Sequence, residues 1–156
     1  MSESYEEIIE GETLLRPPPG QRHELICTRL HEIVSGSIAG GASGRLLERR
    51  SIVQLSAGTL IRPDLSLQDS AHGKLQLAVE VISSEDHRPD TVTKKQIYEE
   101  INVPSLWIVD PRYDNVEVYQ ATPYGLKLVG ILAGKDALRD ERFPSLDVRI
   151  ADLFRD

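Results

Sequence analysis

The apolar run LAVEVI, residues 77–82, constrains this chain more than any other stretch. Short runs of aliphatic and β-branched residues predict a buried strand. Glu80 interrupts this run. Burying a lone carboxylate costs on the order of several kcal/mol, so such a group is normally paired, hydrogen-bonded, protonated or bound to a metal. A partner for Glu80 must therefore come from elsewhere in the chain.

The surrounding pattern predicts strands clustered around two main helices. Helices are expected over 21–35 and 90–101, and IADLFRD predicts a closing helical turn. Strands are expected over 45–48, 51–55, 60–67, 75–83, 105–109, 115–120, 126–132 and 148–150. A chain of 156 residues suits one domain with a real core and is short for two, so we expect a single α+β (mixed α/β) domain over 1–156 with a central sheet.

Charge and composition narrow the functional classes. The net charge of −7 argues mildly against a general nucleic-acid binder. Five glutamates among the first twelve residues carry much of that charge, whereas residues 16–50 hold six arginines and three glutamates. That segment forms either a local basic face or scattered solvated charges.

Localisation is expected to be cytoplasmic, without a membrane partner. No stretch reaches the roughly 18 apolar residues needed to cross a bilayer, and the acidic N-terminus is unlike a signal peptide. Cys27 is the only cysteine, which excludes an internal disulfide and fits a reducing compartment.

The predicted strand 60–67 supplies a second acid. Alternation places Ile61, Pro63, Leu65 and Leu67 on one face, and Arg62, Asp64 and Ser66 on the other. If this strand pairs with the strand of Glu80 as a hairpin with a long loop, the carboxylates of Asp64 and Glu80 converge. A divalent cation would relieve their repulsion, and Mg²⁺ favours one or two carboxylates with water and phosphate.

The second predicted helix supplies a lysine. Helical spacing places Lys94 on the inward face with Ile97 and Ile101, while Lys95 lies on the flank. An inward lysine can serve as an acid–base group or as a point charge. In the first helix, His23 lies one turn before Ile26 and Cys27 on the same apolar stripe, which continues through Leu30, Ile33 and Val34.

Each residue alone also has a structural explanation. Asp64 follows a proline, as turn residues often do, and Glu80 could be half of a structural ion pair with Arg62 or Lys94. Lys94 could lay its aliphatic stem along the core. The order of Pro-Asp, an acid within an apolar strand and an inward lysine is much less expected by chance.

Several segments together resemble the Uma-type restriction endonucleases, a large bacterial family of the PD-(D/E)xK nuclease superfamily. The resemblance covers most of the chain and rests on YEEIIEGE, PPPGQRHELICTRL, IRPDLSL, LAVEVIS, DTVTKKQIY, VPSLWIVDP and SLDVRIADLF. It implies a restriction-endonuclease-like fold, with a central mixed sheet flanked by helices. The family's Asp, Lys and Tyr at four-residue steps correspond to Asp90, Lys94 and Tyr98.

The resemblance also implies roles for individual residues. Asp64 and Glu80 would bind the metal, with the backbone carbonyl of Val81 as a further ligand. Lys94 would replace the superfamily's catalytic lysine, because Ile82 stands two residues after the glutamate. His23 would either line the site or be a core histidine bonded to the backbone.

The sequence departs from the family pattern in small ways. VISS replaces the commoner Leu-Ser-Pro, Asn102 stands where glycine is usual, and Leu106 stands where an aromatic residue often precedes the tryptophan. None of these changes touches the proposed ligands.

The function expected from the sequence is metal-dependent phosphodiester hydrolysis by an endonuclease acting on nucleic acid, most simply DNA. Mg²⁺ is the expected cofactor, with Mn²⁺ as an alternative. Cutting both strands requires two sites, so a homodimer is expected. Two alternatives stay open: a catalytically silent nuclease-fold binding or scaffolding module, and a purely structural network of Asp64, Lys94 and Glu80.

Overall fold

The structure is a computed structural model that describes residues 4–38, 44–82 and 87–155, and the side chains of 4–38, 44–82 and 91–155. Its helices are α1 (Gln21–Ile38), α2 (His87–Glu100) and α3 (Ile150–Phe154). Its strands are β1 (Tyr5–Ile9), β2 (Glu12–Arg16), β3 (Gly44–Leu46), β4 (Val53–Ser56), β5 (Thr59–Ile61), β6 (Leu65–Asp69), β7 (Leu75–Val81), β8 (Ser105–Asp110), β9 (Asn115–Thr122), β10 (Gly125–Ala133), β11 (Ala137–Asp140) and β12 (Phe143–Arg149).

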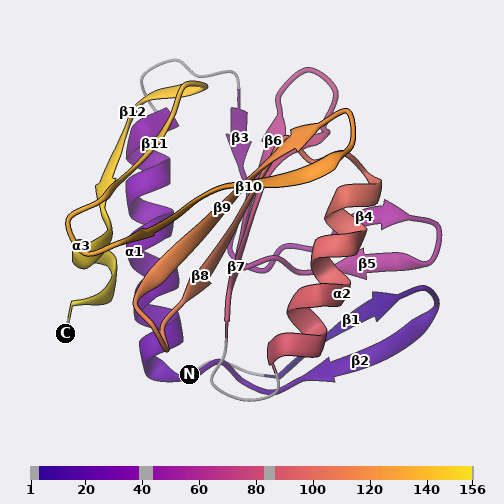
Figure 1. Cartoon of the computed structure of the whole chain (residues 1–156). Helices are drawn as coiled ribbons and strands as arrows, with labels where there is room; N and C mark the ends of the chain where they lie inside the picture. The colour runs from indigo at the N-terminus through magenta and orange to yellow at the C-terminus, as the bar shows by residue number, and fades with distance from the viewer. Residues whose placement is uncertain (1–3, 39–43, 83–86, 156) are drawn as a thin grey trace.

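A mixed six-stranded sheet forms the centre of the molecule (Figure 1), in the order β10-β9-β8-β7-β6-β3. β7 and β8 are parallel and are joined through α2, whereas the other neighbours are antiparallel. A parallel pair needs such a crossover, and the 23 residues between Val81 and Ser105 provide it. The predicted α+β class with a central mixed sheet is therefore confirmed.

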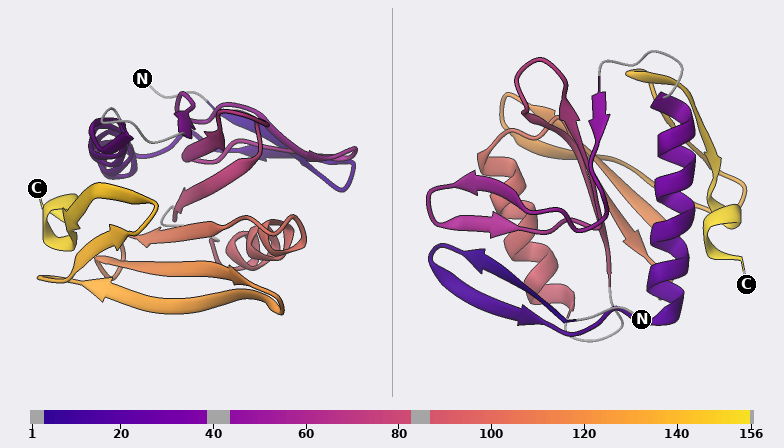
Figure 2. Two further views of the ribbon diagram at one scale, coloured as in Figure 1. Left: turned by 90° about the horizontal axis from the view of Figure 1, so that it is seen from above. Right: turned by 180° about the vertical axis from the view of Figure 1, so that it is seen from behind.

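Two apolar clusters cover the two faces of this sheet. One contains the α1 stripe together with α3, β12 and alternate residues of β7 such as Val79 and Val81. The other contains α2 residues Ile97 and Tyr98, residues of β4 and β5, and Ala78 of β7. α1 and α2 accordingly lie on either side of β7 in both figures (Figure 2). β7 is buried on both faces, as its apolar run predicts.

A second sheet, in the order β2-β1-β5-β4, lies beside α2 (Figure 1). β4 corresponds to the predicted strand 51–55 and β5 to the start of the predicted strand 60–67, β1 lies in the segment YEEIIEGE on which the resemblance rests, and β2 was not predicted. The β1–β2 turn is formed by Glu10 and Gly11, both at positive φ. β11 and β12 form a separate hairpin that packs beside α1, and β11 was not predicted.

The predicted strand over 60–67 is wrong as a single unit. The chain leaves β5 at Ile61, passes through Arg62, Pro63 and Asp64, and enters β6 at Leu65. Pro63 has no N–H to donate to a ladder, so the strand breaks there. As a result Ile61 belongs to the apolar cluster that contains α2, whereas Leu65 belongs to the apolar cluster that contains α1. The two residues therefore do not share one face.

Other differences concern element ends. α1 continues three residues beyond the predicted 35, to Ile38, and the strand predicted at 148–150 is the end of a longer β12 followed by α3. The predicted end of the β7 segment at 83 falls outside the described residues. Across the part of the chain that the structure describes, no helix is both long and apolar enough to span a membrane.

Candidate active site

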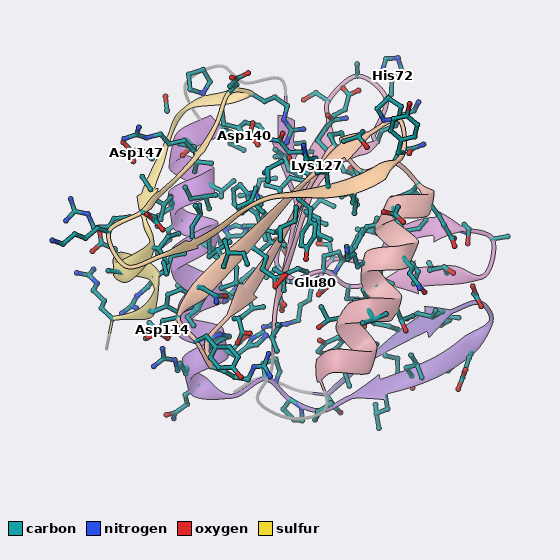
Figure 3. All side chains as sticks on the ribbon, viewed as in Figure 1. His72, Glu80, Asp114, Lys127, Asp140 and Asp147 are labelled. Atoms are coloured by element: carbon teal, nitrogen blue, oxygen red, sulfur yellow. The ribbon has the colours of Figure 1, made fainter. Side chains whose placement is uncertain are left out.

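Glu80 lies near the end of β7 and faces α2 (Figure 3). Lys94 Nζ lies 3.1 Å from Glu80 Oε1 and 3.2 Å from Oε2. The Tyr98 hydroxyl donates a 2.8 Å hydrogen bond to the same Oε1. Because Lys94 and Tyr98 are four residues apart, one face of α2 presents both to the carboxylate. Glu80 and Lys94, predicted as site residues, are brought into direct contact.

Glu7 is a member of this cluster that the sequence analysis missed. Its side chain is inaccessible to solvent and one carboxylate oxygen lies 3.0 Å from Lys94 Nζ. Arg16 Nε donates to it at 2.8 Å and the backbone N–H of Arg62 at 2.7 Å. The available signal was the period-two alternation of Tyr5, Glu7 and Ile9, which turns Glu7 to the inner face of β1.

Asp64 contacts the peptide group that joins Glu80 to Val81. The N–H of Val81 donates to Asp64 Oδ2 at 2.8 Å. β6 and β7 pair with Leu65 opposite Val79, and continuing that antiparallel register by one residue sets Asp64 opposite Glu80. The predicted hairpin with a long loop is therefore confirmed.

The environment of Asp64 favours its charged form. Burial alone would raise the pKa, but the close contact with His23, the hydrogen bond from the Val81 N–H and the positive charge of Lys94 hold the pKa of Asp64 below its usual value. Asp64 Oδ2 takes the bond from Val81, whereas the buried Oδ1 accepts no hydrogen bond from any residue that the structure describes and has Arg50 Nε 3.4 Å away.

His23 connects α1 to the same point of β7. Its Nε2 lies 2.9 Å from the Val81 carbonyl oxygen, so it donates there, and 3.5 Å from Asp64 Oδ2. Its Nδ1 faces Cys27 Sγ at 3.5 Å. Burial raises the pKa of the Cys27 thiol, which keeps the sulfur protonated. His23 is thus a buried histidine bonded to the backbone, as one of the two predicted descriptions has it, and it also lies next to Asp64.

Two side-chain clusters thus meet at residues 80–81. One joins Glu80, Lys94, Tyr98 and Glu7, and the other joins Asp64, His23, Cys27 and Arg50. The guanidinium of Arg50 lies 6.0 Å from the centre of the Tyr5 ring, and burial, followed by the charge of Asp64, raises the pKa of Tyr5. The side chain of Asp90, which the family pattern singles out, lies outside the described residues.

Comparisons with known proteins identify the family and the fold of the chain. The model of the Uma2 family, described as "Putative restriction endonuclease", matches residues 2–151. The chain belongs to the Uma2 family. A solved structure, "a putative nuclease belonging to DUF820" from Anabaena variabilis, superposes with a TM-score of 0.78 at 17% identity, covering 96% of this chain and 89% of that one. This likeness shows the same restriction-endonuclease-like fold.

Two further comparisons add nothing to the family or the fold. A DrdV–DNA complex matches 72% of this chain and 85% of its own at 19% identity, with a TM-score of 0.40 that is too low to establish a common fold. The search of curated proteins finds no match.

The residues present fit the divalent cation that nucleases of this fold use. Hard cations such as Mg²⁺ take oxygen ligands, and the carboxylates of Asp64 and Glu80 with the Val81 carbonyl are such a set. Among the described residues, the buried Asp64 Oδ1 accepts no hydrogen bond, although Arg50 Nε lies 3.4 Å away, so this oxygen could serve as a ligand.

Proposed function

We propose that this Uma2 protein is a metal-dependent phosphodiesterase that acts on DNA as an endonuclease. The observation that carries the proposal is the contact of Lys94 Nζ with both oxygens of Glu80, one residue from the amide that holds Asp64. Asp64, in the segment that leads into β6, is linked to Glu80 on β7 through the Glu80–Val81 peptide group, and α2 brings an amine to Glu80. Two carboxylates and an amine are groups that metal-assisted hydrolysis of a phosphodiester can use.

The role of each residue follows from its contacts. A bound Mg²⁺ or Mn²⁺ would polarise the phosphate and lower the pKa of a coordinated water. Asp64, Glu80 and the Val81 carbonyl would hold that ion. Lys94 keeps a positive charge next to Glu80, where it can neutralise charge on the phosphate or orient the attacking water. Tyr98 and Glu7 position Glu80 and Lys94 through the bonds described above.

Three arginines support a nucleic-acid substrate. Arg50 and Arg62 line a cavity of about 550 Å³ together with Tyr5, and Arg50 also reaches Asp64. Arg16 is paired with Glu7 nearby. Guanidinium groups bind phosphate in a bidentate manner, so this cavity suits the DNA backbone on one side of the scissile bond.

The test is cleavage of supercoiled plasmid with Mg²⁺ or Mn²⁺ by purified wild type, Glu80→Gln and Lys94→Met. We expect each substitution to reduce the rate on the order of 100-fold or more, because each removes a group aimed at the reacting charge. Lys95→Met is the matched control, since Lys95 points instead at the Tyr119 ring, 4.7 Å from its centroid. Equal cutting by folded variants would remove the catalytic assignment.

A structural network is the second candidate. Lys94 is already shared by two carboxylates, and Glu7 is bonded by Arg16 as well, so this cluster balances its charges without a cation. A wild type that fails to cut under any divalent ion, with Lys94→Met that loses stability, would favour that candidate over the enzyme.

A further inference from the structure

The second cluster contains two side chains, those of His23 and Cys27, that the proposed hydrolysis does not use, beside Asp64, which it does use. His23, Cys27 and Asp64 each offer one ligand atom, and these atoms lie within 4.8 Å of one another. All three residues are buried, with 9%, 2% and 5% of their surfaces exposed. A thiol is a poor ligand for Mg²⁺ but a strong one for Zn²⁺ and similar ions.

The geometry of the histidine and the cysteine matches a tetrahedral ion. Ligands at the usual Zn–S and Zn–N lengths with a tetrahedral angle lie about 3.5 Å apart. Cys27 Sγ and His23 Nδ1 are 3.5 Å apart. Their positions i and i+4 on α1 hold that spacing through the helix itself.

The histidine is also oriented as zinc-binding histidines are. Because Nε2 donates to the Val81 carbonyl, the lone pair of the neutral ring lies on Nδ1, facing the sulfur. Metal-bound histidines characteristically donate their other N–H to a carbonyl or carboxylate, which fixes the ring. This outer contact is already in place.

Asp64 provides the independent sign that a cation belongs here. It is almost completely buried, and its Oδ1 accepts no hydrogen bond among the described residues. The positive charge that faces Asp64 and Cys27 is that of Arg50. Its guanidinium lies 3.4 Å from Asp64 Oδ1 and 4.0 Å from Cys27 Sγ. Arg50 also lines the 550 Å³ cavity, so its movement toward the cavity would open a path for an ion.

We propose that His23, Cys27 and Asp64 form a binding site for a thiophilic divalent cation, Zn²⁺ by preference. On binding, the thiol proton passes to the solvent and the thiolate, the carboxylate and the neutral imidazole neutralise the ion's two charges. Glu24, whose Oε1 lies 3.8 Å from His23 Nδ1, or a water completes the tetrahedron.

Asp64 is also a proposed ligand of Mg²⁺ in the hydrolytic site. When Asp64 binds Zn²⁺, it is no longer available to Mg²⁺. This consequence rests on the proposed function, and it makes the site an inhibitory one. The binding itself does not depend on nuclease activity, so the two are tested separately.

The binding test is titration of the full chain with Co²⁺, which gives a near-ultraviolet thiolate-to-cobalt absorption. Cys27 is the only cysteine, so that absorption reports this site alone. We expect one Co²⁺ per chain, displaced by Zn²⁺, no thiolate absorption in Cys27→Ser, and affinity lowered at least about tenfold in His23→Gln and Asp64→Asn. Asp69→Asn is the matched control, because Asp69 pairs with an exposed histidine, His72, at 3.2 Å, without a thiol.

Two results would overturn the site. One is the absence of the thiolate absorption in wild type with excess Co²⁺. The other is an undiminished affinity in both folded His23→Gln and Asp64→Asn. Should either variant fail to fold, thermal unfolding decides, because Zn²⁺ must raise the melting temperature of wild type more than that of Cys27→Ser.

The inhibition is measured as the ratio of plasmid cleavage with and without Zn²⁺ for wild type and Cys27→Ser. A Zn²⁺ effect that is at least about tenfold weaker in Cys27→Ser supports it, and an equal effect overturns it. If neither protein cuts DNA with Mg²⁺ or Mn²⁺, the proposed nuclease function fails, while the Co²⁺ titration still decides the metal site.

Discussion

Lys94 is the side chain that neutralises the buried carboxylates of Glu7 and Glu80. Its side chain is 4% exposed and contacts Glu7, which is inaccessible, and Glu80, which is 13% exposed. Removing one member of a buried ion pair leaves an uncompensated charge, which destabilises more than the pair itself stabilises. The stability of this cluster can therefore be separated from its proposed chemistry.

We expect Lys94→Met to lower the free energy of unfolding by about 3 kcal/mol or more, because two carboxylates lose their shared cation. Glu7→Gln should lower the free energy of unfolding less in the Lys94→Met background than it does in wild type. Urea denaturation of the four proteins in this double-mutant cycle measures the coupling. Lys95→Met is the control and should stay within about 0.5 kcal/mol; additive effects of Glu7 and Lys94 would contradict the contact.

Tyr119 predicts how stability responds to alkaline pH. Burial, followed by the hydrogen bond to Glu117, raises the pKa of the phenol above its usual value. The unfolded chain then loses this proton first, so the tyrosine's contribution is intact below about pH 10 and is lost as pH rises further. The stability of Tyr119→Phe, measured by chemical denaturation, should fall less steeply through this window than that of wild type; an unchanged alkaline slope would contradict it.

At the residue scale, the sequence pattern predicted those side-chain positions that depend only on the local backbone geometry. The inward position of Lys94 followed from helical spacing, and Glu80 followed from its apolar neighbours. Glu7 was missed because its partners, Lys94, Arg16 and the Arg62 amide, come from three other places in the chain. Nothing local distinguishes it from the exposed glutamates beside it.

At the element scale, the end of α2 explains a departure from the family pattern. Asn102 has φ of 55°, its N–H donates to the Glu99 carbonyl, and the Val103 N–H donates to the Tyr98 carbonyl. These two bonds form a Schellman motif, which requires a left-handed residue at the position of Asn102. Glycine adopts that conformation most easily and asparagine tolerates it, so the substitution preserves the turn that leads into β8.

We expect Asn102→Gly to raise the free energy of unfolding by about 0.5–1 kcal/mol and Asn102→Ala to lower it by about 1 kcal/mol. Thermal and urea unfolding measure both. Gln96→Gly, on the exposed face of α2, is the control and should lower stability by about 1 kcal/mol, because glycine is unfavourable within a helix. A loss of stability in Asn102→Gly would contradict the left-handed assignment.

The segment 60–67 shows where element prediction failed. Its alternation of apolar and polar residues favoured one strand, but Pro63 separates two strands that belong to different sheets. The break also frees Asp64 from the ladder, and its carboxylate takes the amide of Val81 instead. Sheet membership depends on long-range pairing, which a local period does not specify.

At the scale of the whole molecule, the central sheet has unequal edges. β3, at one edge, has three residues. β10, at the other, has nine, with Lys127 as its one charged residue, and exposes Leu128, Val129 and Ile131. A long apolar edge is a template for pairing with another strand, and a second copy offers an identical one.

We therefore expect the homodimer to form by antiparallel pairing of β10 with the β10 of a second copy about a two-fold axis. Light scattering after size-exclusion chromatography should give twice the 17.4 kDa chain mass for wild type at micromolar concentration. Val129→Lys/Ile131→Lys should give the monomer mass, because like charges would face each other across the axis. Val92→Lys, on exposed α2, is the control and should remain dimeric. A monomeric wild type would exclude this pairing and, with it, coordinated cutting of two strands by a stable dimer, leaving single-strand nicking as the expected plasmid product.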